Sequence, residues 1–364
     1  MSFQLKCVKC NEIFPFSIDM QTCPHHNQKY GYLEIVYKCD SLINLPIKKP
    51  IIDLGQLKTP LIKAQKFGEF IGLNNLFVKD ESKNPTGSFK DRENFIFFNF
   101  LLENKIHEPI FVVSSGNAAV STSAYVNKSG FKCCCYLPST TSESKKSMIK
   151  LYNGKIIESE GRYEDIYNKL ISDPPEGINA TPGICPLKEE GPKMIAYELF
   201  EQIGIPDKIV VHCGNGTNLW SIYRGFIEIS KSKNIQKMPQ MIGVQVSGGD
   251  PIYQALQKGE EFFIIENPKE SVAEGIIAVE SYSSFKAIKA IKETKGFMVT
   301  VLDKEIIETH KEIIFMESIV PELTSSSVFA ALKKIKADKN EVVVCINTGS
   351  GLKDVKEFAL GTHI

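Results

Sequence analysis

The stretch NPTGSFKDR, residues 84–92, runs directly into an apolar segment and is the most informative part of this 364-residue chain. We expect the apolar segment to be a helix with Lys90 at its N-terminus. The positive end of the peptide dipole lies there and disfavours the ammonium form of a lysine. Such an amine is suited to act as a nucleophile, because only its uncharged form carries a free electron pair. The alternative is an ordinary helix start with a solvated lysine.

A second polar segment follows the apolar run at 110–113. Its backbone N–H groups, free at the start of a predicted helix, form an anion site suited to a carboxylate, and the asparagine adds a neutral donor. The alternative is a simple helix N-cap without chemistry. The segment consists of Ser114, Ser115, Gly116, Asn117 and Ala118.

A third polar segment contains two glycines and lies between the apolar run at 210–213 and a helix-like segment. The glycines allow the backbone to wrap closely around a phosphate, and the threonine and asparagine add side-chain donors. It is neither a Walker loop nor a dinucleotide fingerprint, whose third glycine is here Leu219. The alternative is a glycine turn of no chemical consequence. The segment consists of Gly214, Asn215, Gly216, Thr217 and Asn218.

From about residue 50 onward, short apolar runs alternate with helix-like segments. Alternation of this kind is typical of parallel sheets that are covered by helices on both faces, so we predict an α/β fold. In such sheets the ligand site lies beyond the carboxyl ends of the strands. A fourth polar segment, residues 348–354, lies at such an end and offers the hydroxyl of Thr348 beside two glycines. The predicted strands are 110–113, 131–137, 208–213, 240–246, 298–302 and 341–346, and the predicted helices include 118–128, 143–152 and 164–171.

The first forty residues differ from the rest and predict a small metal-binding ribbon. Two close pairs of soft ligands, separated by twelve residues, have the spacing C-x2-C-x12-C-x2-H that suits tetrahedral zinc. His25 competes for the fourth position, and Cys39 is a further candidate. The alternative is a ribbon that has lost its metal. The predicted ligands are Cys7, Cys10, Cys23 and His26.

Composition excludes several classes of function. Lys plus Arg and Asp plus Glu number 43 each, without the basic excess of a nucleic-acid-binding protein. No apolar run approaches the ~20 residues that a membrane span needs. The N-terminus lacks the apolar core of a secretion signal, and ten cysteines then fit a reducing, cytoplasmic setting.

Taken together and in this order, the four polar segments resemble those of the threonine synthase family of fold-type-II pyridoxal phosphate enzymes, which are tryptophan synthase beta-like. The run at 84–92 is close to diagnostic of that group, and the N-terminal ribbon, ending in Tyr32-Leu33-Glu34, is also similar. The resemblance spans essentially the whole chain. It implies two parallel-sheet lobes with pyridoxal 5'-phosphate in the cleft between them, a small amino-acid substrate, and a homodimer.

The resemblance also implies roles for individual residues. Lys90 would bind the cofactor covalently and shuttle protons, residues 214–218 would hold the cofactor phosphate, and Asn117 would bond the ring hydroxyl. Residues 114–118 would bind the substrate carboxylate. Thr348 would offer its hydroxyl to the pyridine nitrogen. A hydroxyl leaves the ring a weaker electron sink than a carboxylate does, which suits elimination and replacement better than transamination.

The activity that the resemblance implies is a lyase reaction of amino-acid biosynthesis, conversion of O-phosphohomoserine to threonine and phosphate by elimination and water addition. The chain departs from the family at the expected substrate-phosphate site, where Lys188 replaces an arginine and Glu189 adds a carboxylate. The other departures are Glu93 and Ser318 in place of glycines and Ala118 in place of threonine. Two alternatives therefore stay open: a paralogue that performs β- or γ-elimination or replacement on another amino acid such as O-phosphoserine, and a catalytically silent binding protein.

For the domain organisation we expect three parts. Residues 1–40 would form the zinc-ribbon-like segment, and residues 90–185 a small mobile lobe. Residues 41–89 together with 186–364 would form the large lobe that binds the cofactor. The Pro- and Gly-bearing stretch 173–192 is the predicted crossing between the two lobes.

Overall fold

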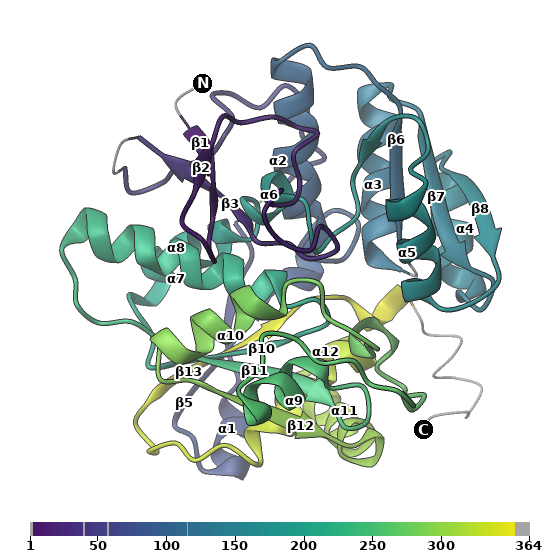
Figure 1. Cartoon of the computed structure of the whole chain (residues 1–364). Helices are drawn as coiled ribbons and strands as arrows, with labels where there is room; N and C mark the ends of the chain where they lie inside the picture. The colour runs from purple at the N-terminus through teal and green to yellow at the C-terminus, as the bar shows by residue number, and fades with distance from the viewer. Residues whose placement is uncertain (1–2, 39–40, 57, 115, 354–364) are drawn as a thin grey trace.

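The computed structural model describes residues 3–38, 41–56, 58–114 and 116–353, and shows two α/β lobes and an N-terminal three-stranded sheet (Figure 1). Two of the candidate residues, Cys39 and Ser115, lie outside the described residues. Within them, no helix has the length and apolar character required to cross a membrane. The α/β fold with parallel sheets is confirmed.

The larger lobe is built on a six-stranded sheet with the order β12-β11-β10-β13-β5-β4. All neighbours are parallel except the edge strand β4, which runs antiparallel to β5. The strands are β4 (Leu61–Lys63), β5 (Asn75–Asp80), β10 (Lys208–His212), β11 (Gln240–Val246), β12 (Phe297–Val301) and β13 (Val342–Asn347).

Helices cover both faces of this sheet, which explains why its strands are continuous apolar runs. In β10, Ile209 and Val211 pack in one core cluster, which includes α8 and α10, while Val210 packs in the opposite cluster with α11 and α12. The helices of this lobe are α1 (Gln65–Ile71), α7 (Lys193–Ile203), α8 (Thr217–Lys233), α9 (Pro251–Lys258), α10 (Ser284–Glu293), α11 (Asp303–Glu317) and α12 (Leu323–Leu332).

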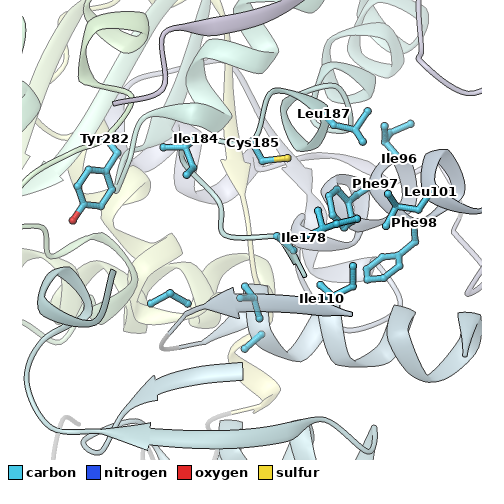
Figure 2. Close-up of a cluster of buried hydrophobic side chains, with 14 of the residues drawn as sticks. Ile96, Phe97, Phe98, Leu101, Ile110, Ile178, Ile184, Cys185, Leu187 and Tyr282 are labelled. Carbon is cyan, nitrogen blue, oxygen red and sulfur yellow. The ribbon is translucent and has the colours of Figure 1, made fainter. Parts of the chain in front are cut away.

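The smaller lobe contains a four-stranded parallel sheet with the order β8-β7-β6-β9. Figure 2 shows part of its core, where Phe97 and Phe98 lie near Ile110 and Ile178. The two-residue β9 was not predicted, because it falls inside the Pro- and Gly-bearing crossing. The elements are α2 (Lys90–Glu103), β6 (Ile110–Val113), α3 (Asn117–Ser129), β7 (Cys133–Pro138), α4 (Glu143–Leu151), β8 (Lys155–Ser159), α5 (Tyr163–Ser172) and β9 (Ile178–Asn179). The short α6 (Pro186–Glu189) follows and contacts α2, β3 and α8.

The N-terminal sheet is antiparallel, with the order β2-β1-β3, and it packs against the rest of the chain. Phe3 meets Phe100 of α2 edge to face, with ring centroids 6.1 Å apart. Buried Lys286 donates to the carbonyl of Leu33, and the guanidinium of Arg224 donates to the carbonyl of Ile35. Its strands are β1 (Phe3–Cys7), β2 (Ile13–Phe14) and β3 (Leu33–Tyr37).

Buried charges fix the start of α2. Arg92 is 3% exposed, and its Nε lies 2.5 Å from Oε2 of Glu81, while its Nη1 lies 2.6 Å from Oε1 of Glu198. The carboxylate of Asp91 accepts hydrogen bonds from the backbone N–H of Thr86 and the hydroxyl of Ser121, at 2.6 Å each. Glu81 and Glu198 belong to the larger lobe, so these contacts attach a helix of the smaller lobe to the larger one.

Arg92→Met should therefore be strongly destabilising, because it leaves the buried carboxylate of Glu81 without its cation and leaves that of Glu198 with Lys79 alone. We expect a loss of about 3–5 kcal/mol in the free energy of unfolding, measured in urea. The matched control is Lys304→Met, which removes a cation that is 85% exposed and 3.8 Å from Glu308, and it should have little effect. Equal effects of the two substitutions would contradict the anchoring role of Arg92.

Candidate active site

The predicted site residues meet in a cleft of about 560 Å³ between the two lobes. The structure does not place Lys188 among the lining residues. The cleft is nevertheless formed by all four polar segments, from α2, α3, α8 and the end of β13. Its lining includes Lys90, Ser114, Gly116, Asn117, Ala118, Gly214, Asn215, Gly216, Thr217, Asn218 and Thr348.

Lys90 is the first residue of α2, as the sequence predicts, and its side chain is 15% exposed. Its Nζ donates to Oε1 of Glu93 at 2.6 Å and lies 4.5 Å from the ring centroid of Phe89. Glu93, where the family has glycine, thus contacts the amine directly. The second oxygen of Glu93, Oε2, is buried and has no hydrogen-bond partner among the described residues.

The loop at 214–218 has the geometry of a phosphate cradle. Gly216 has a φ of +90°, and a Cβ at this position would lie 2.8 Å from the Cβ of Ala287, so only glycine fits. The loop leads into the N-terminus of α8, a favourable position for an anion. Both side-chain amide atoms of Asn218 are buried without a hydrogen-bond partner in the described part of the chain. These residues therefore fit the phosphate of pyridoxal phosphate.

Thr348 lies in a buried chain of neutral groups. Its Oγ1 is 2.8 Å from Oγ of Ser325, and it also pairs with Nε2 of His212. Burial lowers the pKa of His212 to about 4, which keeps the imidazole uncharged at neutral pH. The sequence analysis did not select His212, although its place at the carboxyl end of β10, just before the phosphate loop, was a usable signal.

Asn117 belongs to a charged network that the sequence did not reveal. Its Nδ2 lies 2.8 Å from Oε2 of Glu322, and Nζ of Lys353 donates to its Oδ1 at 2.6 Å. Glu322 and Lys353 are themselves 3.0 Å apart. The network fixes the orientation of the Asn117 amide, because Glu322 accepts from its nitrogen and Lys353 donates to its oxygen.

The charge of the cleft lining is mainly negative. Among the lining residues that the structure describes, the lysines are Lys90 and Lys145, and Nζ of Lys145 lies 3.4 Å from Oε2 of Glu274. Lys145 comes from α4 of the smaller lobe and lies over Gly116, at the start of α3. The acidic side chains of the lining are Glu164, Glu270, Glu274, Glu280, Asp303 and Glu322.

Lys188 is buried in α6, with 2% exposure, and its Nζ lies 5.3 Å from the ring centroid of Phe97. Desolvation lowers the pKa of Lys188 to about 8, an effect that the negative charge of Glu93 opposes. The additional carboxylate, Glu189, pairs with Lys286 at 2.7 Å. Lys188 and Glu189, the two residues of α6 that depart from the family, are therefore both buried and do not line the cleft.

The comparisons with known proteins agree with this site. Residues 52–349 match the family described as pyridoxal-phosphate dependent enzyme. The chain belongs to this family. It is 32% identical to the threonine synthase of Methanocaldococcus jannaschii, over 96% of this chain and 92% of the relative, and 30% identical to that of Methanosarcina acetivorans, over 97% and 92%. The chain is thus a pyridoxal phosphate-dependent lyase related to threonine synthases.

Solved structures with the same fold have more varied activities. Threonine deaminase isoform 2 from Solanum lycopersicum aligns with a TM-score of 0.69 and 20% identity, over 84% of this chain and 88% of that one. Maize serine racemase aligns with a TM-score of 0.70 and 19% identity, over 84% and 94%. At this level of identity the likeness shows the fold alone. It confirms the fold-type-II architecture.

The four predicted metal ligands come together in the N-terminal ribbon. The ligand atoms of Cys7, Cys10, Cys23 and His26 all lie within 4.8 Å of one another. His25 turns away, and its Nε2 lies 3.1 Å from a carboxylate oxygen of Glu12. Three thiols and one imidazole are a ligand set that suits tetrahedral zinc, so we propose a structural Zn²⁺ site here.

The zinc site is tested by metal analysis of the purified protein. We expect one zinc per chain in the wild type, and loss of the metal in Cys23→Ser and His26→Ala, because each removes one of four ligands. His25→Ala is the matched control and should keep the metal. Zinc content that depends on His25 rather than His26 would contradict the ligand assignment.

The burial of Lys188 predicts a pH dependence of stability. Because the pKa of Lys188 is about 8 in the folded state and 10.5 is its ordinary value, the unfolded chain binds more protons between these two pH values. Stability contributed by this residue should thus rise with pH across this window, by up to about 3 kcal/mol. Between pH 8 and 10.5, the free energy of unfolding measured in urea should rise by that amount more for the wild type than for Lys188→Met. The profile of Lys304→Met should follow that of the wild type. Parallel pH profiles for wild type and Lys188→Met would contradict the burial of a charged amine.

Proposed function

We propose that this chain converts O-phosphohomoserine to threonine and phosphate by elimination and water addition. The observation that carries the proposal is the convergence of the Lys90 amine and the phosphate cradle at 214–218 in one cleft. Threonine synthases that align over more than nine-tenths of the chain support the same reaction. Pyridoxal phosphate, when bound, would supply the electron withdrawal that makes the α proton of an amino acid acidic.

The chain's own residues would divide the remaining work. The Lys90 amine, one turn from the Glu93 carboxylate, is placed to accept a proton from the substrate and return it to another carbon. The N-terminus of α3 at Gly116 and Asn117 would hold the substrate carboxylate. Thr348, bonded to the uncharged His212, would present a hydroxyl rather than a charge to the cofactor ring.

The substrate phosphate would need a cation of its own, in addition to the cradle that holds the cofactor phosphate. Since Lys188 does not line the cleft, Lys145 is the better placed candidate: its side chain lies over Gly116, where the substrate carboxylate would bind. Lys145 is a point charge without the bidentate geometry of an arginine. We therefore expect a substrate phosphate to be held less tightly here than by an arginine clamp.

A second candidate is elimination or replacement on another amino acid, for example O-phosphoserine. The acidic lining of the cleft favours it. Among the described lining residues, six are acidic and two are lysines, and pairing of Glu280 with Lys29 and of Glu322 with Lys353 still leaves an excess of carboxylates, so a dianionic leaving group gains little there. The same lining would accept a substrate with a neutral or cationic side chain.

The two functions are separated by supplying O-phosphohomoserine and O-phosphoserine to the enzyme with its cofactor and measuring threonine and phosphate. We expect threonine and phosphate in equal amounts from O-phosphohomoserine. Lys90→Ala should lower this rate by about 10³-fold or more while the protein stays folded, because it removes the amine that acts on cofactor and substrate. Lys83→Ala, which removes a lysine that is 59% exposed, is the matched control.

Three outcomes would contradict parts of the proposal. Turnover that persists in Lys90→Ala would remove the role of this lysine. Phosphate release from O-phosphoserine alone, with the cofactor absorbance band intact, would favour the second candidate. A colourless protein that ignores added cofactor would favour a catalytically silent binding protein.

A further inference from the structure

The ribbon makes contact with the wall of the cleft through a loop at residues 27–31. The hydroxyl of Tyr30 donates to the carboxylate of Glu280, which also pairs with the ammonium group of Lys29. The backbone N–H of Gly31 donates to the carbonyl of Tyr282 at 2.8 Å. Glu280 is 3% exposed and lines the cleft. The loop therefore holds the cleft-lining segment 280–283 by both side chains and backbone.

The segment 280–283 also contacts the first two residues of the phosphate cradle. The backbone N–H of Tyr282 donates to Oδ1 of Asn215 at 3.2 Å, and that of Ser283 donates to the Asn215 carbonyl at 3.2 Å. The hydroxyl of Ser281 donates to the carbonyl of Gly214 at 2.6 Å. Three consecutive residues thus position the two residues that begin the cradle.

The loop is packed too tightly to move independently of the segment. A Cβ at Gly31 would lie 2.5 Å from the carbonyl oxygen of Gly183, which also accepts from Oγ of Ser283 at 2.5 Å. On the side of the smaller lobe, the hydroxyl of Tyr167 donates to the carbonyl of Lys29 at 3.2 Å, and the Tyr167 ring stacks on that of Tyr282 at 3.9 Å. A shift of the loop would be transmitted to residues 282 and 283.

The loop begins directly at the proposed metal site. His26 is one of the four ligands, and its ring lies 5.1 Å from that of Tyr32, at the other end of the loop. The backbone N–H of Val8, between the first two cysteine ligands, donates to the carbonyl of Tyr32 at 2.9 Å. Both ends of the loop are therefore attached to the cluster of Cys7, Cys10, Cys23 and His26.

We propose that the N-terminal ribbon helps to position the cofactor site. Tyr30 is a positioning residue: it acts through Glu280 and the segment 280–283 on the phosphate cradle. The proposal rests on pyridoxal phosphate binding at that cradle, and its metal arm rests on the proposed zinc site. Since the metal orders the loop and the loop orders the cradle, zinc and cofactor binding are coupled. Coupling between two sites is reciprocal, so each ligand strengthens binding of the other by the same factor.

The first test is the dissociation constant of pyridoxal phosphate in Tyr30→Phe, measured by absorbance titration of cofactor-free protein. We expect an increase of about fivefold or more, which is the lower end of ordinary coupling. Tyr223→Phe is the matched control, because it removes another tyrosine hydroxyl that donates to a carboxylate, that of Glu293, away from the cleft. Circular dichroism checks that both variants are folded, and Glu280→Gln serves as a second variant if Tyr30→Phe is not.

The second test removes zinc from the intact chain with a chelator and repeats the titration. We expect weaker cofactor binding by a similar factor, and slower zinc release when pyridoxal phosphate is present. Neither measurement involves turnover, so failure of the proposed reaction would leave both results interpretable. Equal dissociation constants for wild type, Tyr30→Phe and Glu280→Gln, or zinc release that ignores the cofactor, would overturn the proposal.

Discussion

The arrangement of the cleft depends on one buried cation, Arg92, held between the carboxylates of Glu81 and Glu198. Removing charges from water is costly and is compensated only when each charge is paired and hydrogen-bonded, so this cluster tolerates few alternative geometries. Lys90 lies two residues before Arg92, at the first position of α2. The pairing of Arg92 therefore sets where the Lys90 amine emerges between the lobes.

The cleft separates neutral groups from charged ones. Thr348 contacts a serine hydroxyl and an uncharged histidine. The acidic side chains of the cleft lining belong to other segments. The carboxylates in and after α6 form buried ion pairs away from the cleft: Glu189 pairs with Lys286, and Glu190 pairs with Arg224 and Lys193. This division fits a cofactor whose ring nitrogen stays unprotonated and whose anionic end is bound by backbone and amide groups.

The sequence was sufficient to predict most of the fold and the four polar segments that line the cleft. Strands buried on both faces are continuous apolar runs, and glycine-rich loops at their ends depend on local backbone requirements, as Gly216 shows with its positive φ. Ser318, noted as a departure from glycine, likewise has a φ of +56° at the end of α11. This conformation explains why glycine is usual at this position, because glycine adopts it at least cost, and nothing in the structure explains the serine.

Contacts between residues distant in sequence could not be predicted. Glu322 and Lys353 reach Asn117 from the N-cap of α12 and from the end of the described chain, and Lys145 enters the cleft from α4. The position of Lys188 was also hidden, because a lysine in place of an arginine gives no indication of whether it faces the cleft or the core. Only the packing of α6 against α2 decides that question.

The central claim is that the Lys90 amine and the phosphate cradle bind one molecule of pyridoxal phosphate. The most direct measurement is to load the protein with the cofactor, reduce it with borohydride, and map the modified peptide by mass spectrometry. The account predicts one stable pyridoxyl adduct, on Lys90, which is absent when the clash of Gly216→Ala with Ala287 distorts the cradle. An adduct on another lysine, or none on Lys90, would contradict it.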